Sequence, residues 1–257
     1  KVFAKQTPTR YFLNNPKSIK RLIKPRDRFN HKGNFGHALL IAGSKGKMGA
    51  AVLAARAALR AGVGLLTVHV PAHANFILQS AVPEAMTTQD QATDFFSGRE
   101  IESFYTAVGI GSGLGQAPET LTGFEHVLNQ SVKPMVLDAD ALNILSVKPA
   151  LLAKVPAGSI LTPHPGEFKR LVGEWQNDFD KLEKLLTLAQ RLKSAVVLKG
   201  AYSAIALADG SIYFNSTGNP GMATGGSGDV FTGILTALLA QGYSTTDAAL
   251  IGVYVHG

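Results

Sequence analysis

A glycine-rich stretch at residues 218–231 has the composition of a phosphate-binding loop, and an apolar helical pattern follows it directly. Five of its fourteen residues are glycine, and glycine lets the backbone adopt positive φ and approach a ligand closely. The helix would add unpaired N–H groups and the positive end of its dipole, which attract anions. Asp229 stands at this helix start, where a carboxylate can take a proton from a substrate hydroxyl. The competing interpretation is a tight loop in which Asp229 is only an N-cap.

More polar or glycine-rich clusters each follow a short apolar run that has the length of a buried strand. In open α/β sheets the carboxyl ends of parallel strands meet at one edge, and ligands bind along that edge. The clusters together therefore predict a ligand groove rather than a set of unrelated turns. They are Gly43-Ser44, Gly111-Ser112-Gly113, Asp138-Ala139-Asp140, His164-Pro165-Gly166-Glu167 and Lys199-Gly200.

For several side chains in these clusters, the sequence is compatible with two different roles. Lys199 ends a strand, where it could meet a nucleotide phosphate or simply be solvated. His164 lies between two prolines, a stiff setting that suits a ligand contact or a hydrogen bond to the backbone. Asp138 and Asp140 could form a carboxylate pair or help to hold a metal, whereas Asp140 could instead cap the next helix.

Standard nucleotide motifs are not matched. Residues 43–47 lack the Lys-Ser/Thr ending of a P-loop, and residues 111–115 miss the GxGxxG dinucleotide fingerprint by one position. The histidines show no metal-ligand spacing, and the absence of cysteine excludes disulfides and a thiolate zinc site. A redox enzyme that holds its dinucleotide in the usual way is therefore not supported.

The positive charge is concentrated near the start of the chain. The formal charge is +7, and ten of the basic residues lie within residues 1–32 beside a single acid, Asp27. This distribution indicates a solvated arm or linker rather than a nucleic-acid-binding face. No apolar run is long enough to span a membrane and no signal pattern is present, so we expect a cytoplasmic protein without a membrane or nucleic-acid partner. Because the chain begins at Lys1 and ends inside an apolar helical pattern, we expect it to be part of a longer polypeptide.

Predicted strands and helices alternate along the chain, which is typical of a mostly parallel sheet covered by helices on both faces. The pattern from residue 203 to residue 215 predicts a β-hairpin toward the C-terminal third, with its turn at Asp209-Gly210. We expect residues 31–257 to form one α/β domain and residues 1–30 to form a basic N-terminal arm or interdomain linker. Strands are expected at 36–43, 64–70, 105–111, 134–138, 159–162 and 195–199, and helices at 48–61, 119–129, 178–193, 230–239 and from 245 onward.

Taken in order, these segments resemble the ADP/ATP-dependent NAD(P)H-hydrate dehydratases, which have a ribokinase-like fold. The glycine loop at 218–230 matches the family signature, and the resemblance extends from about residue 31 to the end. The other matching segments are 31–37, 43–51, 137–143, 162–167 and 198–201.

The resemblance implies a hydro-lyase that repairs NADH or NADPH hydrated at C6 of the nicotinamide ring. ADP, or alternatively ATP, would phosphorylate the C6 hydroxyl of the S form with the help of Mg²⁺, and phosphate elimination would restore NAD(P)H. With ADP the other products would be AMP and phosphate. A homotetramer is also implied, and residues 1–30 resemble the linker to an N-terminal epimerase domain in fused members.

The resemblance also implies roles for single residues. Asp229 would be the catalytic base, and Gly226 and Gly228 would help to hold the transferred phosphoryl group. No metal ligand is implied. The positions that would contact the hydrated dinucleotide are Ala50, Ala51, Gly111, Gly113, His164 and Asp229. The positions that would bind the adenine nucleotide are Lys199, Gly200, Ala201, Tyr202, Ser203, Gly225, Gly226, Ser227 and Gly228.

Two other functions compete with this one. A vitamin-precursor kinase of the hydroxymethylpyrimidine or hydroxyethylthiazole type would share the glycine loop and Asp229. It should lack the patterns at residues 48–51 and 164–167. A nucleotide-binding regulatory domain would retain the loop without catalysis.

Overall fold

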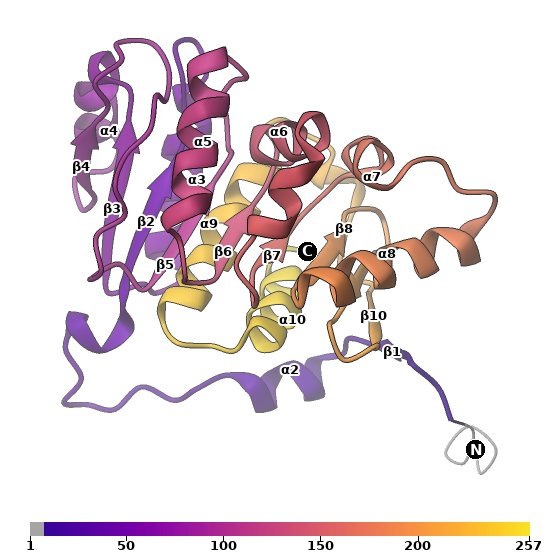
Figure 1. Cartoon of the computed structure of the whole chain (residues 1–257). Helices are drawn as coiled ribbons and strands as arrows, with labels where there is room; N and C mark the ends of the chain where they lie inside the picture. Colours follow the sequence, from indigo (N-terminus) through magenta and orange to yellow (C-terminus); the bar gives the residue numbers. More distant parts are fainter. Residues whose placement is uncertain (1–7) are drawn as a thin grey trace.

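The computed structural model describes residues 8–257 (Figure 1), so Lys1 and Lys5 of the basic segment lie outside the described residues. The strands form one sheet in the order β1-β10-β9-β8-β7-β6-β5-β2-β3-β4. All pairs from β8 to β4 are parallel, whereas β9 is antiparallel to both β8 and β10. The predicted hairpin is therefore confirmed. The strands are β1 (Tyr11–Leu13), β2 (His37–Ile41), β3 (Leu65–Val70), β4 (Met86–Gln89), β5 (Ala107–Ile110), β6 (Met135–Leu137), β7 (Ile160–Leu161), β8 (Ala195–Leu198), β9 (Ser203–Ala206) and β10 (Ile212–Asn215).

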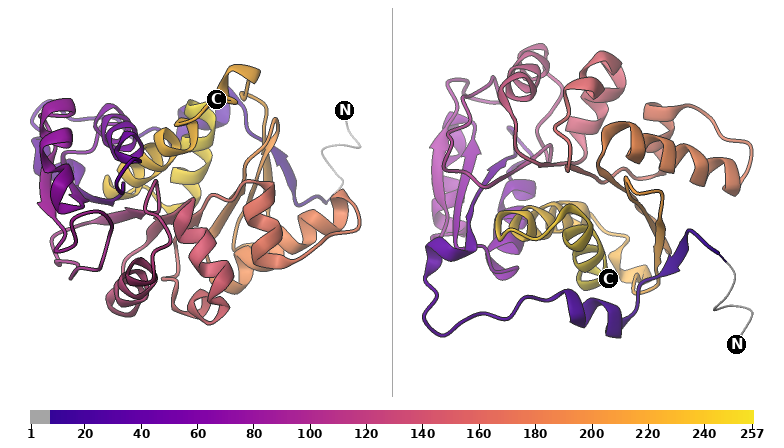
Figure 2. Two further views of the ribbon diagram at one scale, coloured as in Figure 1. Left: turned by 90° about the horizontal axis from the view of Figure 1, so that it is seen from above. Right: turned by 60° about the horizontal axis from the view of Figure 1, so that its bottom comes forward.

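Helices cover both faces of this sheet, as predicted, and Figure 2 shows α9 and α10 on the side opposite α5, α6 and α8. Successive side chains of a strand point to opposite faces. In β2, Ala38 and Leu40 pack into one core with α9, whereas Leu39 and Ile41 pack into the other with α5. This two-sided burial explains the unbroken apolar runs. The helices are α2 (Pro16–Leu22), α3 (Met48–Arg60), α4 (Asn75–Ala81), α5 (Pro118–Gln130), α6 (Asp140–Val147), α7 (Pro165–Val172), α8 (Asp178–Leu192), α9 (Ser227–Ala240) and α10 (Thr245–His256).

Close packing of α3 against α9 fixes the position of α9. A Cβ atom on Gly233 would lie 2.1 Å from the carbonyl oxygen of Ala54, so only glycine allows this approach. On the sheet side, a Cβ atom on Gly109 would lie 2.2 Å from Thr236 Oγ1, so α9 also lies directly on β5. Together these contacts hold the glycine-rich start of α9 at the carboxyl edge of the sheet.

The described part of the basic segment lies against the domain. Strand β1 pairs with β10 in parallel at the edge of the sheet, and α2 packs against α10. Ile19 of α2 is 4% exposed, and the buried Asn14 donates from Nδ2 to the carbonyl oxygen of Leu250 at 3.1 Å. Residues 8–30 therefore contain a strand and a helix that contact the core, while a linker role for residues 1–30 stays a prediction.

Across residues 8–257 the helices are all too short or too polar to cross a lipid bilayer.

Candidate active site

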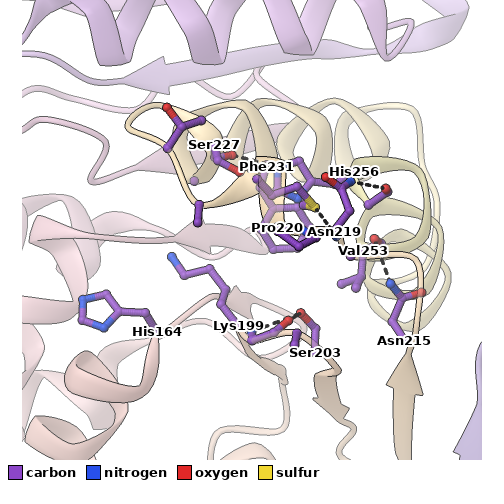
Figure 3. A pocket seen from close by; sticks show the side chains of 18 of the residues that line it. His164, Lys199, Ser203, Asn215, Asn219, Pro220, Ser227, Phe231, Val253 and His256 are labelled. Atoms are coloured by element: carbon purple, nitrogen blue, oxygen red, sulfur yellow. Dashed lines mark hydrogen bonds between the residues drawn. The ribbon is translucent and has the colours of Figure 1, made fainter.

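A cavity of about 700 Å³ opens at the sheet edge that the strand-end clusters predict (Figure 3). Its walls come from the ends of β7 and β8, the glycine-rich loop, the start of α9 and the end of α10. This volume lies within the usual range for small-molecule sites. The lining residues are His164, Lys199, Gly200, Ala201, Ser203, Asn215, Gly218, Asn219, Pro220, Met222, Ala223, Thr224, Gly225, Ser227, Gly228, Phe231, Val253, His256 and Gly257.

The start of α9 faces this cavity. Gly226 is the N-cap in a left-handed conformation (φ 94°), and Ser227 and Gly228 of the first turn line the cavity. Asp229 also lies in the first turn, so the interpretation of Asp229 as an N-cap is wrong. The first turn and the positive dipole end of a fourteen-residue helix thus lie at the cavity, an arrangement that favours an anion.

Lys199 reaches into the cavity between His164 and the Ser227 end of α9 (Figure 3). Its Nζ lies 2.7 Å from Oδ1 of Asp138, which is 1% exposed at the end of β6. The second oxygen, Asp138 Oδ2, accepts a hydrogen bond from Thr232 Oγ1 of α9 at 3.0 Å. Lys199 is therefore a paired cation, not a solvated one.

His164 combines both roles that its sequence setting left open. Its Nδ1 accepts a hydrogen bond from the N–H of Gly166 at 3.0 Å and so caps α7, and its ring is half-exposed beside the cavity. Glu167 completes a capping box, because its Oε2 accepts from the N–H of His164 at 2.8 Å. Burial raises the pKa of the Glu167 carboxyl, which is 3.9 Å from Lys199 Nζ.

Burial also raises the pKa of Asp229. The charge of Asp138 adds to this shift, whereas Lys199 opposes it. The hydroxyl of Ser112 opposes the shift more than Lys199 does, but burial outweighs both. A carboxylate with a raised pKa is a stronger base, which suits proton removal from a hydroxyl group.

Asp138 and Asp140 do not form a carboxylate pair. Ala139 between them has φ 47° and ψ −116°, a strained backbone for a residue with a side chain, and the two carboxyls serve different partners. Asp140 Oδ2 accepts from the N–H of Gly115 at 2.7 Å, and its Oδ1 accepts from Gln116 Nε2 at 3.1 Å. Ala139 is the N-cap of α6, so the capping role expected for Asp140 is wrong.

The residues implied to contact the dinucleotide divide into two groups. His164 borders the cavity, while Ala50 and Gly113 lie against each other outside its lining: a Cβ atom on Gly113 would be 2.9 Å from the Ala50 methyl group. Ala51 is fully buried and Ala50 is partly exposed, so only Ala50 of this pair offers its side chain to a ligand. Gly111 (φ 128°) makes room for the carbonyl oxygen of Asp138, which a Cβ atom there would approach to 1.9 Å.

The implied nucleotide residues mostly gather around the cavity. Tyr202, which is 71% exposed, and the N-cap Gly226 are outside the lining. Those that line it are Lys199, Gly200, Ala201, Ser203, Gly225, Ser227 and Gly228.

Phe231 and His256 line the cavity without having been singled out from the sequence as ligand contacts. Their rings stack with centroids 4.9 Å apart, and His256 Nε2 donates to the carbonyl oxygen of Ser227 at 2.8 Å. Burial lowers the pKa of His256, which favours the neutral ring. The sequence could have indicated Phe231 as a lining residue, because it follows Ser227 by one helical turn and so lies on the same face of the helix. No such signal exists for His256, since only the tertiary fold brings α10 to this point.

An α/β domain with an anion site and a lysine at its sheet edge is thus defined, and comparison with known proteins identifies its family. The family described as NAD(P)H-hydrate dehydratase matches residues 38–257. The bifunctional NAD(P)H-hydrate repair enzyme Nnr of Moorella thermoacetica is 41% identical over 90% of this chain and 46% of its own. The ADP-dependent (S)-NAD(P)H-hydrate dehydratase of Bacillus subtilis is 36% identical over 93% of this chain and 85% of its own. The chain belongs to the NAD(P)H-hydrate dehydratase family.

Solved structures confirm the ribokinase-like fold. The Bacillus subtilis ADP/ATP-dependent NAD(P)H-hydrate dehydratase, co-crystallised with ATP and Mg²⁺, superposes with a TM-score of 0.82 at 33% identity, covering 96% of this chain and 87% of that one. A ribokinase-like protein of Enterococcus faecalis gives 0.83 at 27% identity, with 97% and 87% covered. The chain spans about half the length of the bifunctional relatives that it matches.

Hydroxyethylthiazole kinase of Pyrococcus horikoshii shares only the fold, with a TM-score of 0.55 at 15% identity over 92% of this chain and 80% of that one. The vitamin-precursor kinase alternative is therefore not favoured.

Proposed function

We propose that this domain dehydrates the S form of hydrated NADH or NADPH at the expense of ADP. One observation carries the proposal: the buried carboxyl of Asp229 lies in the same helical turn as Ser227 and Gly228, which face the cavity beside Lys199. A base and a phosphate site are thus adjacent, as phosphoryl transfer to a hydroxyl group requires.

The proposed reaction has two steps. Asp229 takes the proton of the C6 hydroxyl, whose oxygen attacks the terminal phosphorus of ADP, and the bond to the bridging oxygen breaks to release AMP. The C6–O bond of the phosphorylated intermediate then breaks as the ring nitrogen donates its electron pair, phosphate leaves, and loss of the C5 proton restores the dihydronicotinamide ring. The sum is hydrated NAD(P)H plus ADP giving NAD(P)H, AMP and phosphate.

The cavity suits the two ends of a nucleotide differently. Lys199 and the N–H groups of α9 would hold the phosphates, where developing charge is stabilised by fixed donors. Phe231 of α9 and Val253 of α10 would give a base an apolar surface. His164 also lines the cavity, where it would contact the hydrated dinucleotide.

Mg²⁺ fits this donor set. Residues 8–257 hold no cluster of three or more His, Cys, Asp or Glu side chains arranged to bind a metal ion. Mg²⁺ in nucleotide sites, however, uses only one or two carboxylates together with phosphate oxygens and waters. Glu167, whose Oε2 lies 3.9 Å from Lys199 Nζ, would supply such a carboxylate. When bound, Mg²⁺ would neutralise phosphate charge during transfer.

The proposal is tested with the S form of hydrated NADH, Mg²⁺ and either ADP or ATP. We expect the absorbance of reduced nicotinamide to return with ADP, in equal amount to the AMP that forms, and more slowly with ATP. A reaction with neither nucleotide would overturn the dehydratase proposal. Nucleotide binding without turnover would instead favour the regulatory domain.

Further family properties stay predictions for this chain. They are the homotetramer, the cytoplasmic location, and an epimerase domain joined through residues 1–30. Light scattering of the purified protein tests the tetramer directly.

A further inference from the structure

The carboxyl group of Asp138 is the most deeply buried charge beside the cavity, and the proposed reaction gives it no proton to carry. Asp138 is 1% exposed, and both of its oxygens are engaged. Oδ1 lies 2.7 Å from Lys199 Nζ, and Oδ2 accepts from Thr232 Oγ1 at 3.0 Å. The carboxyl therefore links the end of β8 to α9 and is held from both sides.

The two members of the Asp138–Lys199 ion pair differ in solvent exposure, which leaves Lys199 accessible to a ligand. The Asp138 side chain is closed off from solvent, whereas Lys199 is 25% exposed and lines the cavity. An ammonium group has three donors, and Asp138 takes one of them. A Cβ atom on Gly228 would lie 3.7 Å from Lys199 Nζ, so the ammonium group sits beside the first turn of α9. Its remaining donors are thus next to the anion site.

The backbone around Asp138 is shaped to hold its position. Ala139 adopts φ 47°, which costs conformational energy for any residue except glycine. Gly111 leaves space for the Asp138 carbonyl oxygen, which a Cβ atom would approach to 1.9 Å. Strain of this kind persists where the surrounding structure imposes it, and it is concentrated at functional sites.

We propose that Asp138 is a positioning residue that holds the Lys199 ammonium group against the phosphate-binding start of α9. This inference rests on the proposed function, because it takes Lys199 as a phosphate contact. A lysine side chain is flexible, and a fixed partner removes the need to order it when the phosphate arrives. Thr232 keeps the carboxylate in place by binding its second oxygen.

A double-mutant cycle between Asp138→Asn and Lys199→Met tests the proposal, with the affinity for ADP–Mg²⁺ measured by titration calorimetry. Asparagine keeps the shape and the hydrogen bond to Thr232 but removes the charge. We expect Asp138→Asn to weaken ADP binding about tenfold when Lys199 is present and by less than about twofold in the Lys199→Met background. A carboxyl with a merely structural role would give equal losses in both backgrounds.

The matched control is Asp90→Asn. Asp90 is also buried and paired, 3.1 Å from His69 Nε2, but His69 does not line the cavity, whereas Lys199, the partner of Asp138, does. We expect this variant to lose stability without losing affinity for ADP. Equal losses of ADP affinity in Asp90→Asn and Asp138→Asn would overturn the proposal, because loss of any buried carboxylate would then explain the effect.

Circular dichroism establishes first that the variants are folded. If Asp138→Asn does not fold, Thr232→Val replaces it in the cycle, because valine removes the donor to Oδ2 and leaves the ion pair. We then expect Thr232→Val to lose less affinity for ADP than is expected for Asp138→Asn, and to lose it only when Lys199 is present. A loss independent of Lys199, or none at all, contradicts the proposal.

The cycle separates this inference from the proposed function. Coupling in ADP binding without any repair of hydrated NADH would leave Asp138 as a positioning residue and overturn only the dehydratase proposal. Repair activity with no coupling, or an unchanged ADP affinity in Lys199→Met, would overturn the positioning role and leave the dehydratase proposal intact.

Discussion

Burial raises the pKa of the Asp229 carboxyl, and the negative charge of Asp138, which directly follows β6, raises it further. Since the folded state then holds the Asp229 proton more tightly than the unfolded chain does, folding stability falls as the pH rises from the ordinary pKa of 3.8 through the raised value. Above that window the ionised carboxylate opposes folding. The proposed base is thus kept at a cost in stability, as is common for catalytic groups.

Replacement of Asp229 by Asn should separate these two effects. We expect turnover to fall by about 10²–10⁴-fold, because the base is lost, while nucleotide binding is retained. The melting temperature should rise at neutral pH, and the gain should vanish on acidification below the window. Melting curves across pH, with ADP titrations at neutral pH, measure both. Turnover that survives would show that another group is the base, and a lower melting temperature at neutral pH would contradict the burial argument.

Gly228→Ala should weaken nucleotide binding without loss of the fold. The new methyl group would lie 3.5 Å from Asp138 Oδ2 and 3.7 Å from Lys199 Nζ, which are ordinary contacts. It would occupy space that a phosphate needs, while the helix gains up to about 1 kcal/mol in propensity. We expect a stable protein with ADP affinity reduced at least about tenfold.

The control for that variant is Gly49→Ala in α3, where an added Cβ atom meets nothing within 4 Å. It carries the same change in helix propensity away from the cavity. Calorimetry should find its ADP affinity unchanged, and an equal loss in both variants would remove the steric explanation.

The N-terminal segment is expected to contribute to stability. Ile19 of α2 is buried in the core that includes α10, so Ile19→Ala should cost about 2–5 kcal/mol in the free energy of unfolding. Lys17→Ala, at an exposed position of the same helix, should cost less than about 0.5 kcal/mol. Urea denaturation measures both changes. If the two variants were equally stable, the segment would be the solvated linker that its composition suggests.

Sequence periodicity predicted the central strands because both of their faces are buried and their runs are unbroken. Strands β1 and β4 were not predicted, since each lies at an edge of the sheet and keeps exposed side chains, such as Leu13 and Met86. Helix α7 was missed because Pro165-Gly166 reads as a loop. The signal was nonetheless present, with proline at the first helical position and Glu167 in a capping box.

Contacts between residues far apart in the sequence set the other limit on what the sequence could predict about the site. The residues of the anion site were found because they are consecutive along the chain, and the clusters at strand ends because parallel strands share an edge. The hydrogen-bond partners of the Asp138 and Asp140 carboxyl groups could not be predicted, because they are distant in sequence. Lys199 is 61 positions from Asp138, and Gly115 is 25 positions from Asp140. Which carboxyl met which donor depended on the turn at Ala139, and no local pattern marks an alanine for positive φ.

Ala139→Gly should stabilise the protein. Ala139 adopts φ 47° and ψ −116°, a conformation that glycine reaches without strain, so the substitution should recover about 1–3 kcal/mol. Against this, glycine makes the unfolded chain more flexible by about 0.4–1 kcal/mol. We expect a net gain of up to about 2 kcal/mol in the free energy of unfolding, measured by urea denaturation. Ala141→Gly in α6 is the control, and it should destabilise by at least about 1 kcal/mol because Ala141 is helical and fully buried. Equal destabilisation in the two variants would mean that the backbone at Ala139 is not strained, and the support which that strain gives to a fixed Asp138 would be lost.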